Sequence, residues 1–288
     1  MKRFSKILIP LLLTVLPLGA QDRPGLLFAD VQFFADSLQA GRACGTGGAQ
    51  AVTFYLLRQL RDLGLRTTVQ SFDAGGRAGH NVVAVTPGWY RSYIVVGACF
   101  DGLGTLNGSC YPGADSNASG VAALLALARS LSGSAPGETG LIFVAFDGHH
   151  ADQAGSRAFL ERFREQYPMR LMVNLDILGS ALAPVRLGRP DYLIALGGAS
   201  QRSALEAANR GPGLDLSYDY YGSAAFTELF YRRVGDQRCF LEAGIPAIVF
   251  TSGITDHTNK TTDTPATLHY PLLSRRIDLI TIWLRSLL

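Results

Sequence analysis

The sequence predicts a three-layer α/β sandwich, in which helices cover both faces of a mostly parallel or mixed central sheet. Short, almost wholly apolar segments at 93–98 and 141–146 are typical of strands covered on both faces. Helical segments alternate with such strands along the chain, as in α/β proteins. With 48% hydrophobic and 17% charged residues among 288, the chain has enough apolar material for one large core, which excludes a disordered protein.

The expected elements follow one another from residue 28 to the C-terminus. Residues 50–63 place a phenylalanine and leucines on one helical face and stop before Gly64, which predicts an amphipathic helix with a glycine at its end. Residues 121–131 consist mainly of alanine and leucine and predict a buried helix. We expect the other helices at 28–39, 155–167, 200–210 and 271–288. We expect the other strands at 69–72, 81–85, 171–175, 192–196 and 247–251.

The N-terminus has the pattern of a secretory signal peptide. Lys2, Arg3 and Lys6 precede a short apolar run that ends in small residues at Ala20. This pattern predicts a signal peptide over 1–20, export to the periplasm or the medium, and one domain over 21–288. The run is short for a membrane span, so no integral membrane domain is expected, and an N-terminal anchor is the alternative.

The remaining composition excludes several classes of function. Without the three basic residues of the N-terminus, 23 of the 26 basic residues remain, which equals the number of acidic residues. The net charge is then zero, so charge gives no reason to expect nucleic acid as a partner. No dinucleotide-binding glycine motif, phosphate loop or serine nucleophile elbow occurs. Cys44, Cys99, Cys110 and Cys239 are compatible with disulfides in an exported protein and equally with free buried thiols.

Polar residues follow the predicted strands at the points where the strands end. Because the carboxyl ends of parallel strands meet at one edge of a sheet, we expect these side chains to converge there. Acid, imidazole and thiol groups that converge in this way predict a metal site or an acid–base site. The residues concerned are Cys99, Asp101, Asp115, His149, His150, Asp176, His257 and Asn259.

Seven short motifs occur in an order that is characteristic of one enzyme family. They are Gly-Arg and Gly-Thr at 41–46, Gly-Ala-x-x-Asp at 97–101, Pro-Gly-Ala-Asp-x-Asn-Ala-Ser-Gly at 112–120, Phe-Asp-Gly followed by Gly-Ser-Arg within 146–157, Val-Asn-Leu-Asp at 173–176, Phe-Leu-Glu-Ala-Gly-Ile-Pro at 240–246 and Asp-Thr at 263–264. With these motifs the chain resembles the co-catalytic zinc aminopeptidases, family 28 of metallopeptidase clan MH, over about residues 28–288. The resemblance implies a zinc-aminopeptidase-like (phosphorylase/hydrolase-like) fold and peptide hydrolysis.

The resemblance implies a site with five metal ligands and a glutamate base beside two zinc ions. Asp115 falls at the position of the bridging aspartate, and Asp176 at that of the second aspartate ligand. Asp101 falls at the position of a residue that orients a histidine ligand. Both ligand aspartates are therefore retained.

The other four positions of the implied site carry different residues. Cys99 stands where a histidine ligand is expected, and His149 stands at the position of the base. His150 replaces a glutamate ligand, and Asn259 occupies the last histidine position, with His257 two residues away. With two carboxylates in place of four, the charge of two zinc ions is not balanced, and an ordinary two-zinc site is not expected.

Three hypotheses about activity follow. The first is a catalytically silent protein without metal, whose cleft binds a peptide or an amino-acid-like ligand. The second is a hydrolase with at most one zinc ion, held by Cys99, Asp115 and Asp176 or by Asp115, His150 and His257, with His149 as the base.

The third hypothesis is a Cys99 nucleophile activated by His149, for which the sequence offers no orienting third group. The same superfamily includes glutaminyl cyclases, which use one zinc ion.

Asp236 and Arg238 are interpreted as members of a solvated ion-pair network with Arg232 and Arg233. The sequence does not indicate an oligomeric state.

Overall fold

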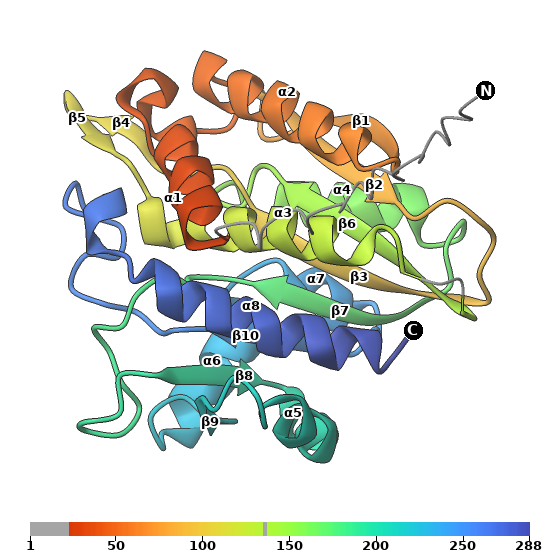
Figure 1. Cartoon of the computed structure of the whole chain (residues 1–288). Helices are drawn as coiled ribbons and strands as arrows, with labels where there is room; N and C mark the ends of the chain where they lie inside the picture. Colours follow the sequence, from red (N-terminus) through yellow and green to blue (C-terminus); the bar gives the residue numbers. More distant parts are fainter. Residues whose placement is uncertain (1–22, 135–136) are drawn as a thin grey trace, which may run out of the picture.

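An eight-stranded mixed sheet with the order β1-β2-β6-β3-β7-β10-β8-β9 runs through the centre of the molecule (Figure 1). The computed structural model describes residues 23–134 and 137–288, so the expected signal peptide over 1–20 lies outside the described residues. The strands of the sheet are β1 (Arg66–Asp73), β2 (Ala78–Val85), β3 (Ser92–Cys99), β6 (Thr139–Phe146), β7 (Met169–Leu175), β8 (Tyr192–Leu196), β9 (Asp215–Ser217) and β10 (Ala247–Thr251). A separate hairpin consists of β4 (Gly104–Leu106) and β5 (Ser109–Tyr111).

The four central strands of the sheet are parallel. β3 pairs with β6 on one side and with β7 on the other, and β7 pairs with β10, in each case in parallel register. β2 and β8 run antiparallel to their inner neighbours β6 and β10. The carboxyl ends of β6, β3, β7 and β10 therefore lie at the same edge of the sheet, where ligands bind in open α/β folds.

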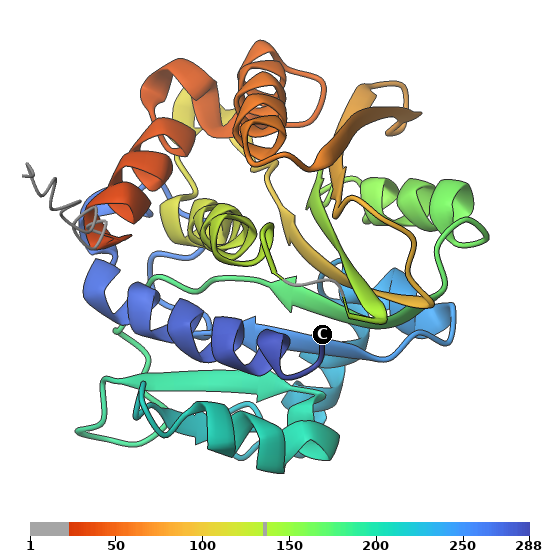
Figure 2. The same cartoon turned by 45° about the vertical axis from the view of Figure 1, so that its right-hand side comes forward.

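Helices cover both faces of the sheet, which confirms the predicted three-layer sandwich (Figure 2). The α-helices are α1 (Arg23–Phe34), α2 (Gly47–Asp62), α3 (Ser119–Leu131), α4 (Ala154–Phe163), α5 (Arg202–Ala208), α6 (Ala224–Arg233), α7 (Gln237–Glu242) and α8 (Tyr270–Arg285). Short helical turns are η1 (Ser37–Arg42), η2 (Ala114–Ala118), η3 (Gly198–Gln201) and η4 (Pro265–Thr267). α1, α3 and α8 lie side by side on one face, and α4 and α7 pack together on the other.

The period-two alternation of the strands divides the core between the two faces. In β2, Val82 and Ala84 join the cluster beneath α1, α3 and α8, whereas Val83 and Val85 join the cluster beneath α4 and α7. β3 alternates in the same way. Apolar residues on both faces explain why these strands have continuous rather than alternating hydrophobic sequences.

The first expected helix differs most in its boundaries. The helix predicted over 28–39 is α1, which begins at Arg23 and ends at Phe34, followed by the turn η1. Asp36 causes the break, because its side chain accepts a hydrogen bond from the backbone of Leu38 at 2.8 Å and caps the new turn. The short elements β4, β5 and β9 and the helices α6 and α7 were not predicted, because they lack a long hydrophobic period.

Two further findings concern general properties of the chain. All four cysteines are free thiols, and three of them, Cys44, Cys99 and Cys239, are buried. Among the helices of residues 23–134 and 137–288, none is long and apolar enough to cross a membrane.

Candidate functional site

A pocket opens at the carboxyl edge of the four parallel strands. Its walls come from the segments that follow β3, β6, β7 and β10, together with the helix α6 and the turn η2. The lining residues are Cys99, Asp101, Ser116, Asn117, His149, His150, Asp176, Ile177, Phe230, Val234, Ile254, Thr258 and Asn259. The pocket therefore lies where the strand-end pattern of the sequence places it.

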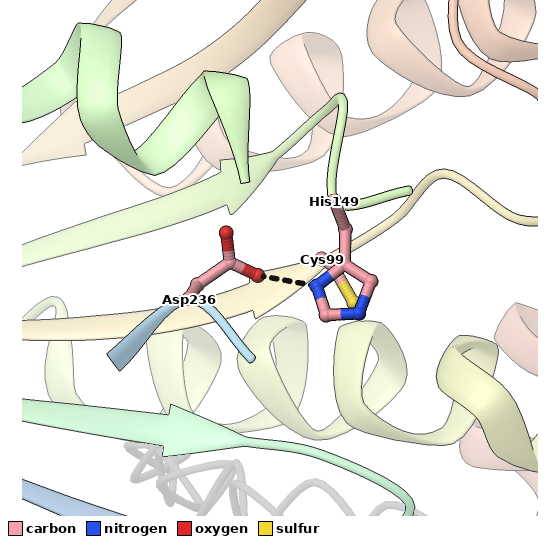
Figure 3. A group of neighbouring side chains, drawn as sticks. All are labelled: Cys99, His149 and Asp236. Atoms are coloured by element: carbon pink, nitrogen blue, oxygen red, sulfur yellow. Dashed lines mark hydrogen bonds and ion pairs between the residues drawn. The ribbon is translucent and has the colours of Figure 1, made fainter. Parts of the chain in front are cut away.

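Three side chains with reactive or ligating atoms, Cys99, His149 and Asp236, lie close together (Figure 3), and the first two of them line this pocket. Cys99 ends β3, His149 lies in the loop between β6 and α4, and Asp236 lies in the turn between α6 and α7. One ligating atom from each lies within 4.8 Å of those of the other two. His149 Nδ1 is 3.1 Å from Asp236 Oδ2, and the sulfur of Cys99 lies beside the same imidazole ring.

Burial and proximity change the protonation of this cluster. Burial raises the pKa of the Cys99 thiol to about 11, and the neighbouring His149 acts against that rise. Burial by itself would lower the pKa of His149, but Cys99 and the hydrogen bond to Asp236 raise it well above its usual value. Asp236 is only 1% exposed, so a charged imidazole is the partner that its buried carboxylate requires.

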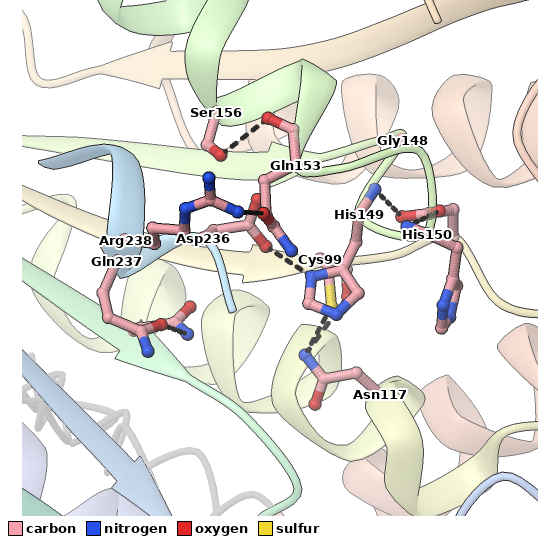
Figure 4. Close-up of polar contacts among 12 residues, drawn as sticks. Cys99, Asn117, Gly148, His149, His150, Gln153, Ser156, Asp236, Gln237 and Arg238 are labelled. Atoms are coloured by element: carbon pink, nitrogen blue, oxygen red, sulfur yellow. Dashed lines mark hydrogen bonds and ion pairs between the residues drawn. The ribbon is translucent and has the colours of Figure 1, made fainter. Parts of the chain in front are cut away.

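The side chain of Asn117 links Cys99, at the end of β3, to Leu175, at the end of β7. Its amide group donates hydrogen bonds to Leu175 O at 2.9 Å and to Cys99 O at 3.2 Å, and it lies 3.5 Å from Cys99 Sγ (Figure 4). Its carbonyl oxygen accepts from the backbone of Ile177 at 3.0 Å. Asn117 thereby connects the ends of β3 and β7 and holds Cys99 in place.

Asp101 holds the backbone of the histidine pair. Its carboxylate accepts hydrogen bonds from the N–H groups of His149 at 2.9 Å and His150 at 3.3 Å. Burial raises its pKa to about 7. The resemblance implied that Asp101 orients the side chain of a metal ligand, but its carboxylate contacts the main chain and shapes the loop after β6.

The structure does not bring Asp115 into the pocket. Its Oδ1 accepts hydrogen bonds from Ser119 Oγ at 2.9 Å and Gly179 N at 2.7 Å. Of the same turn, Ser116 and Asn117 line the pocket instead. The carboxylate of Asp263 accepts the N–H groups of Asp115 and Ser116 at 2.8 and 3.0 Å and thus fixes this orientation. Asp115 therefore connects two loops and does not line the pocket with the other expected ligands Cys99, His150 and Asp176.

His150 and Asp176 do line the pocket, but neither belongs to the cluster of converging donors. Figure 4 shows the ring of His150 on the opposite side of His149 from Asp236. Burial, followed by the nearby His149, lowers the pKa of His150 to about 4, so its ring is neutral. Burial raises the pKa of Asp176, which follows β7.

Of the two residues expected at or near the last ligand position, Asn259 and His257, only the first lines the pocket. Asn259 lines the pocket, at an exposed position on its rim. His257 does not line it, and its Nδ1 lies 2.9 Å from Thr262 Oγ1 within the loop that follows β10. The set Asp115, His150 and His257 that the sequence suggested for one metal ion is therefore not formed.

Asp236 is the member of this cluster that sequence reasoning did not place at the site. It lies 87 residues after His149, in a turn between two helices that the hydrophobic pattern did not predict. The solvated ion-pair network expected for Asp236 and Arg238 with Arg232 and Arg233 is wrong, because Asp236 is buried against His149, and Arg238 pairs with Asp152 and Glu242. The available signal was the spacing of Asp236 just before the motif at 240–246.

The donor set of the pocket does not fit two metal ions. Among the described residues, the histidine, cysteine and acidic groups that converge closely enough to hold an ion are Cys99, His149 and Asp236. Two ions need about four ligands each, some of them shared. A single ion at this cluster would have to replace the hydrogen bond between His149 and Asp236, which already occupies one nitrogen and one oxygen.

Comparisons with known proteins agree with this architecture. An alkaline phosphatase isozyme conversion protein of Escherichia coli is 27% identical over 213 residues, which cover 62% of this chain and 60% of that protein. The curated relatives are matched over 36% to 60% of their own length. A zinc aminopeptidase from Bacillus subtilis superposes with a TM-score of 0.74 at 14% identity, over 92% of this chain and 94% of that one.

A glutaminyl cyclase from Porphyromonas gingivalis has the same fold. It superposes with a TM-score of 0.74 at 18% identity, over 92% of this chain and 98% of the other. The sequence model of Peptidase family M28 matches residues 81–283, which include β3, β6, β7, β10 and the whole pocket. The chain therefore belongs to peptidase family M28, the family that its motifs resemble.

Proposed function

We propose that this protein is an exported member of the M28 family whose two-zinc centre is degraded, and whose pocket binds a peptide or an amino-acid-like ligand. The observation that carries the proposal is the arrangement of the expected ligands. Asp115 faces Ser119 and Gly179, and His257 faces Thr262. Without these groups, the zinc-dependent mechanism of the family lacks its metal-bridging carboxylate and its last imidazole.

The lining of the pocket supports a ligand that has both an amino group and an apolar side chain. Phe230, Val234 and Ile254 form an apolar part of the wall. Asp176 supplies a carboxylate on the same pocket, and a bound ammonium group would stabilise its charged form against burial. An amino-acid amide with a branched aliphatic side chain combines the two features.

A second candidate function is hydrolysis with a single zinc ion. The cluster of Cys99, His149 and Asp236 favours it, because thiolate, imidazole and carboxylate are all zinc ligands. This set shares only Cys99 with the first set that the sequence suggested and no residue with the second. Zinc bound there would leave a fourth position open to water.

The export proposal rests on the basic start and short apolar run of residues 1–20. Expression of the full chain in a bacterium with a periplasm tests it. We expect the mature protein in the periplasm or the medium, with an N-terminus at Gln21 by intact mass. An uncleaved chain in the membrane fraction would contradict signal-peptide cleavage and favour the N-terminal anchor.

Metal content distinguishes the two candidate functions. The purified chain is dialysed against zinc and then against metal-free buffer, and its zinc content is measured by elemental analysis. We expect much less than one zinc ion per chain, and no hydrolysis of leucine 4-nitroanilide. One zinc ion per chain that disappears in Asp236→Asn but persists in the matched variant Asp152→Asn would support the single-zinc hydrolase and overturn the first proposal.

Ligand binding tests the rest of the proposal. Leucinamide and its N-acetylated form are compared by calorimetric titration, because they differ only in the ammonium group. We expect leucinamide to bind and its N-acetylated form to bind at least tenfold more weakly, with the same loss in Asp176→Asn. Equal binding of the two compounds would contradict a role for the carboxylate of Asp176.

A further inference from the structure

The cluster of Cys99, His149 and Asp236 has the order of groups found in nucleophilic triads. Asp236 Oδ2 is hydrogen-bonded to Nδ1 of His149, at 3.1 Å. The sulfur of Cys99 lies beside the ring near the nitrogen that Asp236 does not contact (Figure 3). A carboxylate that orients an imidazole, which in turn faces a nucleophile, is the arrangement by which proteins activate serine and cysteine side chains.

Among the described residues, His149 is the only hydrogen-bond partner of the Asp236 side chain. That side chain is 1% exposed, and Oδ1 is buried without a hydrogen-bond partner among the described residues. Its neighbour Gln237 instead contacts Asn174 and the main chain of α6, and Arg238 pairs with Asp152 and Glu242. A buried carboxylate whose hydrogen bond goes to one imidazole is costly unless that imidazole is charged. The orienting group that the sequence did not reveal is therefore present.

Cys99 is buried yet accessible from the pocket. It is 5% exposed and lines the pocket wall together with His149. Asn117 holds its backbone oxygen and lies 3.5 Å from its sulfur, so the thiol is kept at the end of β3. A ligand that enters the pocket reaches the sulfur and the imidazole at the same time.

We propose that Cys99, His149 and Asp236 form a cysteine nucleophile triad that accepts acyl groups from esters or thioesters. The inference rests on the proposed loss of the two-zinc centre, because a metal ion bound to Cys99 would block its sulfur. Cys99 is the catalytic residue of this reaction, His149 transfers the proton, and Asp236 is a positioning residue.

Apart from the ester or thioester, water is the only reactant that the reaction consumes. The reacting form is the thiolate of Cys99 beside the charged imidazole of His149, and its sulfur bonds to the acyl carbon. The bond from the acyl carbon to the alkoxide or thiolate leaving group then breaks, and the leaving group takes a proton from His149. Water next attacks the acyl-cysteine, the now neutral His149 accepts a proton from the water, the sulfur leaves again as the thiolate, and the carboxylic acid is released.

The backbone around His149 explains why an ester or a thioester, rather than a peptide, is the expected substrate. The N–H groups of His149 and His150 are both bound to Asp101, and the N–H group of Gly148 is bound to Asp147 Oδ1 at 2.8 Å. These donors are therefore not free to stabilise the oxyanion that forms during amide hydrolysis. Esters and thioesters have better leaving groups and depend less on such donors.

The experiment uses zinc-free protein and 4-nitrophenyl acetate as the probe. Intact-mass analysis detects the acetyl adduct, peptide mapping locates it, and absorbance gives the rate of 4-nitrophenol release. We expect one acetyl group on Cys99, none at this site in Cys99→Ala, and a rate at least tenfold lower in His149→Gln and in Asp236→Asn. The matched control Cys110→Ala removes a more exposed thiol that belongs to no cluster of ligating groups among the described residues, and it should react like the original chain.

A second readout separates positioning by Asp236 from a merely structural role. In Asp236→Asn the pH profile of acetylation should shift, whereas partial unfolding would lower the reacting fraction without moving the profile. Equal rates in the original chain and Asp236→Asn, or acetylation confined to other residues, would overturn the triad. Stoichiometric zinc would overturn the proposed function itself, whereas an unreactive Cys99 in zinc-free protein would overturn only this inference.

Discussion

His149 and Asp236 form a hydrogen-bonded ion pair across 87 residues of sequence, between the loop after β6 and the turn before α7. The Nδ1–Oδ2 distance is 3.1 Å, and Asp236 is 1% exposed. Removing one partner of such a pair leaves an uncompensated buried charge. The pair therefore connects the stability of the fold to the integrity of the site.

A double-mutant cycle measures this connection. We expect His149→Ala to lower the free energy of unfolding by about 3–5 kcal/mol, because Asp236 loses its charged partner. The double variant with Asp236→Asn should be less destabilised than the sum of the two single changes. Urea unfolding of the four proteins gives the coupling energy, and strictly additive effects would show that the pair is not coupled.

Arg42 is expected to be essential for stability, because it connects the end of α1, the segment after β3 and the segment before η2. Its buried guanidinium donates hydrogen bonds to the carbonyl oxygens of Phe34, Phe100, Pro112 and Gly113. Arg42→Met leaves these carbonyl groups without their donor and should cost about 3–5 kcal/mol in urea unfolding.

The control for this change is Arg58→Met, which alters an exposed arginine of α2 that is 3.8 Å from Asp62. We expect a change of about 0.5 kcal/mol or less for this surface position. Similar losses for the two variants would contradict a special role for Arg42.

The protonation of Asp115 should make stability depend on pH. Burial, followed by the nearby Asp263, raises its pKa from 3.8 to about 6. As the pH rises from 4 to 6, the unfolded chain releases this proton while the folded chain retains it, so the contribution of Asp115 to stability falls. At 1.36 kcal/mol per pKa unit the fall amounts to roughly 2–3 kcal/mol.

The variant Asp115→Asn isolates this effect, because its amide oxygen still accepts from Ser119 and Gly179. Relative to this variant, the original chain should be most stable near pH 4 and lose its advantage by about pH 6 to 7. Urea unfolding at four pH values checks the sign. A growing advantage with rising pH would mean that the folded protein stabilises the charged carboxylate.

Gly120 is expected to tolerate no side chain, because the ends of α3 and β7 approach closely there. A Cβ atom at this position would lie 2.5 Å from Leu175 O and 2.4 Å from Asn117 Oδ1. Gly120→Ala should therefore cost about 1–3 kcal/mol through overpacking and should disturb Asn117 beside Cys99. Gly133→Ala is the control, since among the described residues other than its chain neighbours no atom lies within 4 Å of its added Cβ. Thermal unfolding of both variants tests the expected contrast.

The sequence predicted the layers of the fold well, because the apolar strands and amphipathic helices carry strong periodic patterns. The strand ranges 192–196 and 247–251 coincide with β8 and β10. The boundaries were less accurate at the first helix, where the side chain of Asp36 ends α1 and caps the following turn. Short elements such as β9 and α7 were missed because a few residues do not establish a period.

The site was only partly predictable, because strand ends determine which loops meet but not which side chains point into the pocket. Cys99, His149, His150, Asp176 and Asn259 line the pocket as the motif order suggests. Asp115 and His257 lie in the expected loops, but local hydrogen bonds turn their side chains elsewhere.

By itself, the sequence determined the fold class and the M28 resemblance, since these depend on residue types in a fixed order. The tertiary structure alone decided that Asp236 contacts His149 and that Asp115 does not line the pocket. The physical reason is that a contact across 87 residues leaves no periodic trace in the chain. It arises only when β6 and α7 pack around the same core.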